Sequence, residues 1–219
     1  MRTATAPGWT RENRRRYAMG RTSNAKERLI DTAVGLIRAR GYASVSVDDL
    51  CRHAGVRKGS FYHFFPSKRD LALAALDAWW ETTRNELLEP AFRPDVPPLK
   101  RIERAFERAT AQQARNEERT GRFQGCPFGN LAMELSAQDE VIREKLDATF
   151  ARFAAYFEAA LAEGVESGDI PAATDVRETA QALLSYLYGI ILMAKTANSA
   201  QLMASLSSHA LRLIPPPLA

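Results

Sequence analysis

The stretch that decides the fold is Val45-Ser46-Val47-Asp48-Asp49-Leu50-Cys51-Arg52-His53-Ala54-Gly55-Val56-Arg57-Lys58-Gly59-Ser60-Phe61-Tyr62-His63-Phe64-Phe65-Pro66-Ser67-Lys68. Ser46 begins a short helix, because the segment 46–49 has the form of a capping box and its aspartates favour the positive end of the helix dipole. Gly55 ends this helix, a second short helix covers about 58–64, and Pro66 closes it. Two short helices joined by a glycine turn predict a helix-turn-helix.

A longer helix precedes this motif. Ile30, Ala33, Val34 and Ile37 repeat at three- and four-residue spacing from about residue 23, and Gly41 is a natural stop. Together the three helices predict a compact N-terminal domain.

Charge is divided unevenly along the chain. Among 219 residues there are 30 Lys or Arg and 26 Asp or Glu, a formal net charge of +4. Residues 1–70 hold 15 basic and 6 acidic residues, a balance of +9, and residues 71–219 balance at −5. A basic first third on an acidic remainder indicates a nucleic-acid-binding module joined to a body with another task.

The helix-turn-helix stretch resembles the TetR family of transcriptional repressors. The resemblance runs from about Ala25 to Leu76 and rests on the spacing of Gly55, Ser60, Tyr62 and Phe65. It implies a homodimer that binds double-stranded operator DNA through this end, and that a small-molecule inducer bound in the C-terminal domain releases the DNA.

The start of the second short helix is where DNA contacts are expected. A recognition helix presents its first residues to the major groove, where Arg57 and Lys58 stand, and Ser46 and Lys68 are candidate phosphate contacts. The resemblance adds the next residues of that helix, with Phe61 and Phe65 packed behind them. The expected DNA-binding set is Ser46, Arg57, Lys58, Gly59, Ser60, Tyr62, His63 and Lys68.

The remainder of the chain is expected to be helical as well. Prolines, glycines and polar steps divide it into helices over about 67–89, 98–118, 127–135, 138–167, 174–196 and 199–213. The fold class is therefore all-α, with about nine helices. The expected domains are a basic arm (1–22), a DNA-binding domain (23–70) and a ligand-binding and dimerisation domain (71–219); within the arm, residues 1–18 fit either an appended leader or an artefact of an upstream start.

Apolar residues near the C-terminus are expected at a dimer interface. The segment from Ala182 to Ala194 is apolar nearly all round, which predicts burial on two sides. In the TetR family the last two long helices form a four-helix interface. The resemblance therefore places these residues in the interface or the adjoining core: Leu183, Leu184, Leu187, Ile191, Leu202 and Leu206.

Cys126 is the candidate sensor residue. It precedes Pro127, a residue suited to the first position of a helix, so the thiol stands near the positive end of a helix dipole. Arg119 and Arg122 lie close in sequence, and both effects favour the nucleophilic thiolate. Neighbouring aromatic residues complete the candidate ligand site: Phe123, Phe128 and Tyr156.

The tract Gly125-Cys126-Pro127-Phe128-Gly129-Asn130-Leu131 also resembles a TetR subgroup that includes repressors of electrophile, reactive-chlorine or acrylate responses. In that subgroup the matching cysteine is tied to inducer sensing. Pro127 and Phe128 depart from its aliphatic pattern, and Phe128 would shield the sulfur. The alternative is therefore a buried structural cysteine at a helix start.

Other functions fit the sequence less well. A thiol enzyme would pair Cys126 with His53, His63 or His209, which lie at the two ends of the chain. A ligand-independent architectural DNA-binding protein would lack a pocket in the acidic domain. Two cysteines and three scattered histidines predict no disulfide framework, no metal site and no cofactor. No apolar run reaches the ~18 residues that span a bilayer, so no membrane contact and a cytoplasmic location are expected.

Overall fold

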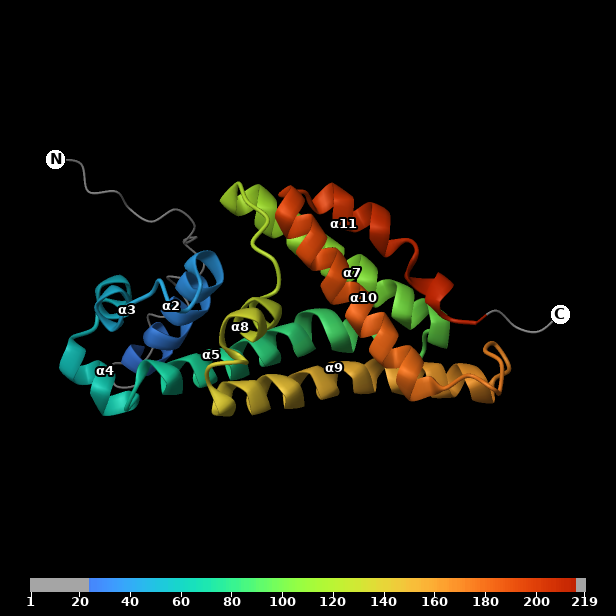
Figure 1. Ribbon diagram of the computed structural model, residues 1–219, viewed down its shortest axis with the longest axis horizontal. Coiled ribbons are helices and arrows are strands. Elements are labelled where there is room, and N and C mark those ends of the chain that lie inside the picture. The colour runs from blue at the N-terminus through green and yellow to red at the C-terminus, as the bar shows by residue number, and fades with distance from the viewer. Residues whose placement is uncertain (1–23, 216–219) are drawn as a thin grey trace.

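The computed structural model describes residues 24–215, and within that range every regular element is a helix, which confirms the all-α class. The predicted basic arm 1–22 and leader 1–18 lie outside the described residues. Figure 1 shows α2, α3 and α4 at one end of an elongated molecule and the C-terminal helices toward the other. The main helices are α2 (Asn24–Arg40), α3 (Val47–Ala54), α4 (Lys58–Phe64), α5 (Lys68–Thr83), α7 (Pro98–Thr120), α8 (Pro127–Leu135), α9 (Glu140–Glu166), α10 (Val176–Ala197) and α11 (Ala200–Ser207).

The helix-turn-helix forms as predicted. Ser46 caps α3, with its Oγ accepting from the Asp49 N–H and the Asp49 carboxylate accepting from the Ser46 N–H. Gly55 ends α3 in the left-handed region at φ +63°, where its N–H reaches the carbonyls of Arg52 and Cys51. That conformation disfavours any residue with a Cβ, so glycine sets the angle at which α4 leaves α3.

A small apolar core holds the three helices together. Leu29, Leu50, Phe61 and Leu71 are each fully buried, contributed by α2, α3, α4 and α5 in turn. Burying a side chain of this size contributes roughly 1.5–3 kcal/mol. The recognition helix α4 is too short to be stable alone, and its position therefore depends on Phe61.

The end of α5 differs from the expected single helix over 67–89. A π-helical turn, Arg84–Leu88, and a short α6, Glu89–Ala91, carry the helix through Pro90. Proline has no N–H to give the carbonyl four residues earlier, which belongs to Glu86. Arg108 of α7 donates to that Glu86 carbonyl at 2.7 Å, so a side chain replaces the missing backbone donor.

The body is built around aromatic rings in two groups. One group lies between α5, α8, α9 and α10, and the other between α6, α7, α9 and α10. The first group is Trp79, Trp80, Phe128, Phe150, Phe153 and Tyr188, and the second is Phe92, Phe106, Tyr156, Phe157 and Tyr186. Rings packed edge to face are directional, which fixes how these helices sit against one another.

The C-terminal helices correct part of the sequence analysis. Leu183, Leu184, Leu187 and Ile191 are at most 9% exposed within a single chain, which fits the adjoining core, and their contact with a partner stays a prediction. Leu202 and Leu206 are half-buried. The helix expected over 199–213 is also broken: α11 ends at Ser207, and a 3₁₀ turn, Ala210–Leu213, follows.

The break after α11 has a local cause. The Ser208 hydroxyl donates to the Ser205 carbonyl at 2.7 Å, and His209 Nδ1 lies 3.2 Å from the same carbonyl. Side chains that occupy a helix carbonyl compete with the next backbone N–H.

A matched pair of glycine variants tests the turn after α3. Nothing lies within 4 Å of a Cβ built at Gly55 or at Gly59, so only backbone conformation separates the two positions. We expect Gly55→Ala to lower the free energy of unfolding by about 1–2 kcal/mol and Gly59→Ala, inside α4, to raise it by up to about 1 kcal/mol. Denaturant unfolding measures both values, and equal effects at the two positions would contradict the assignment.

Candidate DNA-binding surface and sensor site

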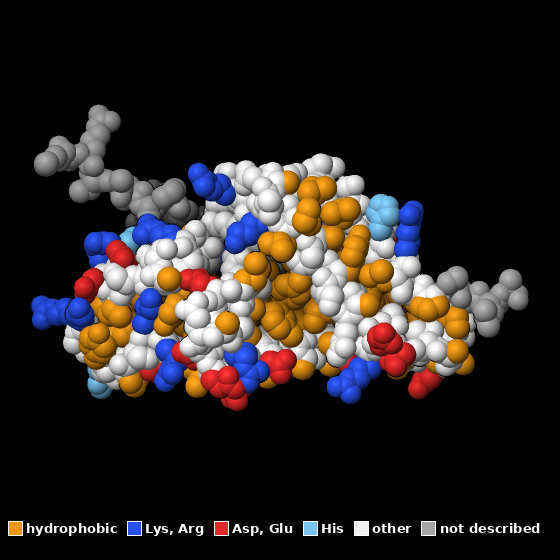
Figure 2. All heavy atoms as spheres, viewed as in Figure 1, with side chains coloured by type: hydrophobic (Ala, Val, Ile, Leu, Met, Phe, Trp, Pro, Cys, Tyr) orange, Lys and Arg blue, Asp and Glu red, His pale blue; other side chains and the backbone are white. Residues whose placement is uncertain are grey.

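The outer face of α4 is exposed and polar. Tyr62 is 50% exposed, Gly59 and His63 are also exposed, and Ser60 is half-buried. Phe61 and Phe65 are buried behind this face. Figure 2 shows Lys and Arg side chains on the surface at this end of the molecule. The expected DNA-contacting residues of α4 therefore share one outward face, while the aromatic residues hold the helix in place.

Two basic residues lie at the start of α4. Arg57 is its N-cap residue, in extended conformation, and makes no side-chain cap hydrogen bond. Lys58 Nζ pairs with Asp48 of α3 at 2.9 Å, and the two side chains are 54% and 71% exposed. The hydrogen bond to Asp48 raises the pKa of Lys58, which is therefore fully protonated at neutral pH. A surface pair of this kind is weak, so a phosphate group can compete for the ammonium.

Ser46 and Lys68 have other partners in the structure. The Ser46 hydroxyl donates to Asp49 Oδ2 at 2.6 Å. Lys68 Nζ donates to the carbonyls of Tyr42 and Val45, both at 3.0 Å, and lies 3.9 Å from the centre of the Tyr42 ring. Burial lowers the pKa of Lys68. Both residues hold the turn between α2 and α3, and their contact with phosphate stays a prediction.

A residue from the body holds the same turn. The Glu134 carboxylate, on α8, accepts hydrogen bonds from the backbone N–H groups of Tyr42 at 2.8 Å and Ala43 at 2.6 Å. Gly41 sits at φ +81°, and a Cβ there would come within 3.2 Å of Glu134 Oε2. The sequence analysis missed Glu134, because its partners lie about ninety residues away and no local pattern marks it.

Cys126 is the N-cap residue of α8 and is half-buried. Its Sγ donates to the Tyr188 hydroxyl on α10 at 3.6 Å. Burial raises the pKa of Tyr188 well above its usual value, so this hydroxyl stays neutral. The thiol thus lies at the positive end of the α8 dipole and beside one polar group.

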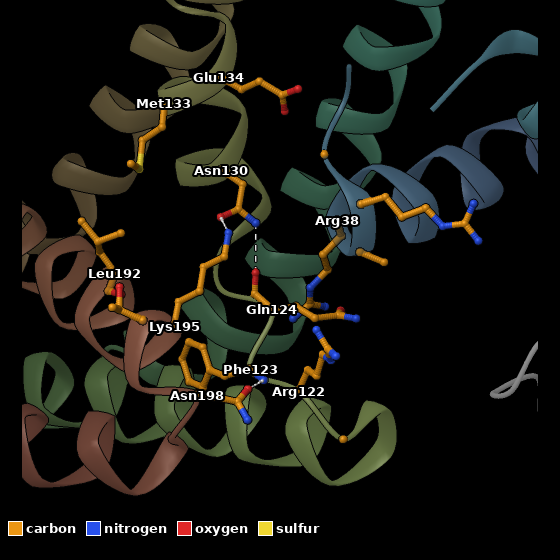
Figure 3. Close-up of a pocket in the computed structure, with 15 residues that line it drawn as sticks. Arg38, Arg122, Phe123, Gln124, Asn130, Met133, Glu134, Leu192, Lys195 and Asn198 are labelled. Atoms are coloured by element: carbon orange, nitrogen blue, oxygen red, sulfur yellow. Dashed lines mark hydrogen bonds between the residues drawn. The ribbon is translucent and has the colours of Figure 1, made fainter. Parts of the chain in front are cut away.

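The glycines and the asparagine around Cys126 have physical roles. Gly125 has φ +76°, and a Cβ there would meet Lys195 Cδ at 3.1 Å; at Gly129 it would meet the Tyr188 ring at 3.1 Å. Asn130 Nδ2 donates to the Gln124 carbonyl at 3.0 Å and its Oδ1 accepts from Lys195 Nζ at 2.7 Å, as Figure 3 shows. The tract is therefore shaped by the close approach of α10.

The other expected sensor residues lie on different sides of the body. Phe128 is buried and packs its ring against Trp79 and Phe153, next to Tyr188 in the first aromatic group. Phe123 is buried in the loop before α8, where its N–H donates to Asn198 at 2.9 Å. Tyr156 belongs to the second aromatic group, against Phe92. The structure brings Phe128 close to Cys126 and places Tyr156 elsewhere.

The histidines have local partners. His53 Nδ1 lies 2.7 Å from the Asp49 carbonyl, the His63 ring packs on Phe64, and His209 lies beside Ser205 and Ser208. Within residues 24–215 there is no group of three or more His, Cys, Asp or Glu placed to hold a metal ion. Across the same residues, no helix combines the length and apolar character needed to cross a membrane.

Comparison with known protein families finds matches in both the N-terminal helices and the body. Residues 29–75 match the profile described as "Bacterial regulatory proteins, tetR family", and residues 98–210 match "Tetracyclin repressor-like, C-terminal domain". A regulator from Lactococcus lactis is 32% identical over 127 residues, which are 58% of this chain and 63% of that protein.

Two further relatives align along most of the chain. The transcriptional regulator AcuR of Cereibacter sphaeroides is 32% identical over 196 residues, 88% of this chain and 87% of that protein. The crystal structure of reduced Escherichia coli NemR superposes with a TM-score of 0.77 at 26% identity, covering 89% of this chain and 99% of the other. The chain belongs to the TetR family of bacterial transcriptional regulators.

Proposed function

We propose that this protein is a homodimeric repressor that binds operator DNA through α4 and releases it when a small molecule acts on the body. The observation that carries the proposal is the outward polar face of α4, with Lys58 and Arg57 at its start and Phe61 buried behind it. NemR of Escherichia coli is described as a transcriptional repressor, which supports repression here. Family membership likewise supports a regulator and not an enzyme.

The dimer surface is proposed on the outer face of α10. Ala182, Ser185, Gly189 and Met193 are exposed at three- and four-residue spacing. Glycine inside a helix costs about 1 kcal/mol relative to alanine, and no atom of the described chain lies within 4 Å of a Cβ at Gly189 to require it. A second copy approaching across a two-fold axis supplies such a reason.

Helix α8 is proposed to transmit the signal. Cys126 caps its first turn and Glu134 stands eight residues later, about 12 Å along the axis. When a maleimide reacts, the sulfur bonds to an alkene carbon and the neighbouring carbon takes up a proton. The added group would push against Tyr188 and displace α8. Glu134 would then lose its hold on Tyr42 and Ala43.

The first test addresses DNA contact. Lys58→Ala is expected to weaken binding to all DNA sequences alike and to flatten the plot of log affinity against log salt by about 0.9 per phosphate contact, or about 1.8 for a dimer. Fluorescence anisotropy with an operator selected from random duplexes, over a KCl series, measures the slope. Arg177→Ala, exposed on α10, is the control and should leave it unchanged. An unchanged slope for Lys58→Ala would remove that contact.

The second test addresses the dimer. Gly189→Arg is expected to convert the wild-type dimer to a monomer of about 24.3 kDa, because a long charged side chain cannot fit between closely packed helices. Gly35→Arg is the matched control, since this helical glycine is also exposed and has open space around it. Sedimentation velocity distinguishes the monomer from the dimer for each variant. Dimeric Gly189→Arg would place the interface elsewhere.

The third test addresses the cysteine. N-ethylmaleimide is expected to lower the operator affinity of the wild type by about tenfold or more, within the usual range of allosteric coupling. Cys126→Ser should bind operator and resist the reagent. Cys51→Ser should respond like the wild type, because it keeps Cys126 and loses only a buried thiol. Equal release of all three proteins would rule out Cys126 as the sensor.

A further inference from the structure

A cavity of about 1020 Å³ lies between the DNA-binding domain and the body. Its walls come from the end of α2, the loop between α7 and α8, the outer side of α8 and the end of α10. Figure 3 shows Arg38 entering from α2, Arg122 from the loop and Lys195 from α10. A ligand-independent DNA-binding protein is expected to have no pocket in the body. Residues of α8 and α10, which belong to the body, line this cavity.

Positive charge in the cavity is poorly compensated. Arg38 Nε is buried and has no hydrogen-bond partner, and within the described part of the chain neither Arg38 nor Arg122 forms an ion pair. Lys195 has an amide oxygen of Asn130 as its partner and no carboxylate. Glu134 is the acidic lining residue, and both its oxygens already accept backbone N–H groups.

A buried cation without a counter-ion is costly, because burial disfavours the charged form. Burial lowers the pKa of Arg38, and the positive charge of Arg119 lowers it further. The guanidinium nevertheless stays charged at neutral pH. A bound anion would relieve the cost.

Part of the remaining wall is apolar, beside polar residues that include Gln124, Asn130 and Asn198. Phe123 is buried at the base of the cavity, and Leu192 of α10 and Met133 of α8 are 42% and 73% exposed, large values for such side chains. Apolar walls with a few convergent charged groups are typical of sites for small organic ligands.

We propose that this cavity binds an organic carboxylate with an apolar body, with Arg38 and Arg122 holding the carboxylate and Lys195 completing the cationic wall. Binding of the carboxylate does not depend on the proposed function, whereas an effect of that binding on operator affinity rests on it. A ligand here touches α2 and the α7–α8 loop at once, so it ties the DNA-binding domain to the segment that carries Cys126.

Calorimetric titration with 2-naphthoate tests the site, with the neutral isostere 2-naphthamide as the matched ligand. The wild type should bind the naphthoate at least about tenfold more tightly than the amide, and added KCl should weaken the naphthoate alone. Arg38→Gln and Arg122→Gln should each lower naphthoate affinity about tenfold. Arg38→Lys, which keeps the charge, should restore part of it. Arg177→Gln is the surface control and should leave the affinity unchanged.

The outcomes separate the site from the function. Thermal unfolding of each variant shows whether it is folded, and Arg122 is itself exposed, so its replacement removes no buried side chain. Equal affinity for naphthoate and naphthamide, or unchanged naphthoate binding in both glutamine variants, would overturn the site. Operator binding by the wild type is measured without ligand. Its absence would overturn the proposed function and leave the site standing.

Discussion

The turn between α2 and α3 is the point on which the two halves of the molecule depend. Glu134 of α8 accepts its N–H groups, and Lys68 of α5 donates to its carbonyls. A charged group that makes hydrogen bonds to backbone fixes geometry more firmly than a surface ion pair does. Together with the packing of α5 against α2, these two side chains hold the helix-turn-helix against the rest of the molecule. Any event that moves α8 therefore changes what holds α3 and α4.

Much of the fold could be predicted from local sequence. Capping serines, glycines with positive φ and prolines at helix starts mark boundaries without help from the rest of the chain, so α4 and α8 begin and end where the sequence places them. The π-helical turn before Pro90 could not be foreseen, because it depends on Arg108 from another helix. The prediction of a helix boundary fails where the residue that supplies the missing hydrogen bond, here Arg108, is distant in sequence.

The candidate sites divide in the same way. The outward residues of α4 follow from a motif, whereas Arg38, Glu134 and Lys195 gain their roles only when three segments meet. Helical periodicity also cannot separate a buried face from an interface, since both are apolar. Leu183 illustrates this: its spacing fits either role, and its complete burial in one chain fits the core.

The contact at the turn has a consequence for how such proteins diverge. Glu134 recognises N–H groups that every residue except proline possesses, and its close approach to Gly41 marks a place in the turn where a side chain would crowd it. The side chains at positions 42 and 43 can therefore change without removing the hydrogen bonds to Glu134. In this architecture the contact that joins α8 to the helix-turn-helix involves no side chain of α4, so the outward residues of α4 can change without disturbing it.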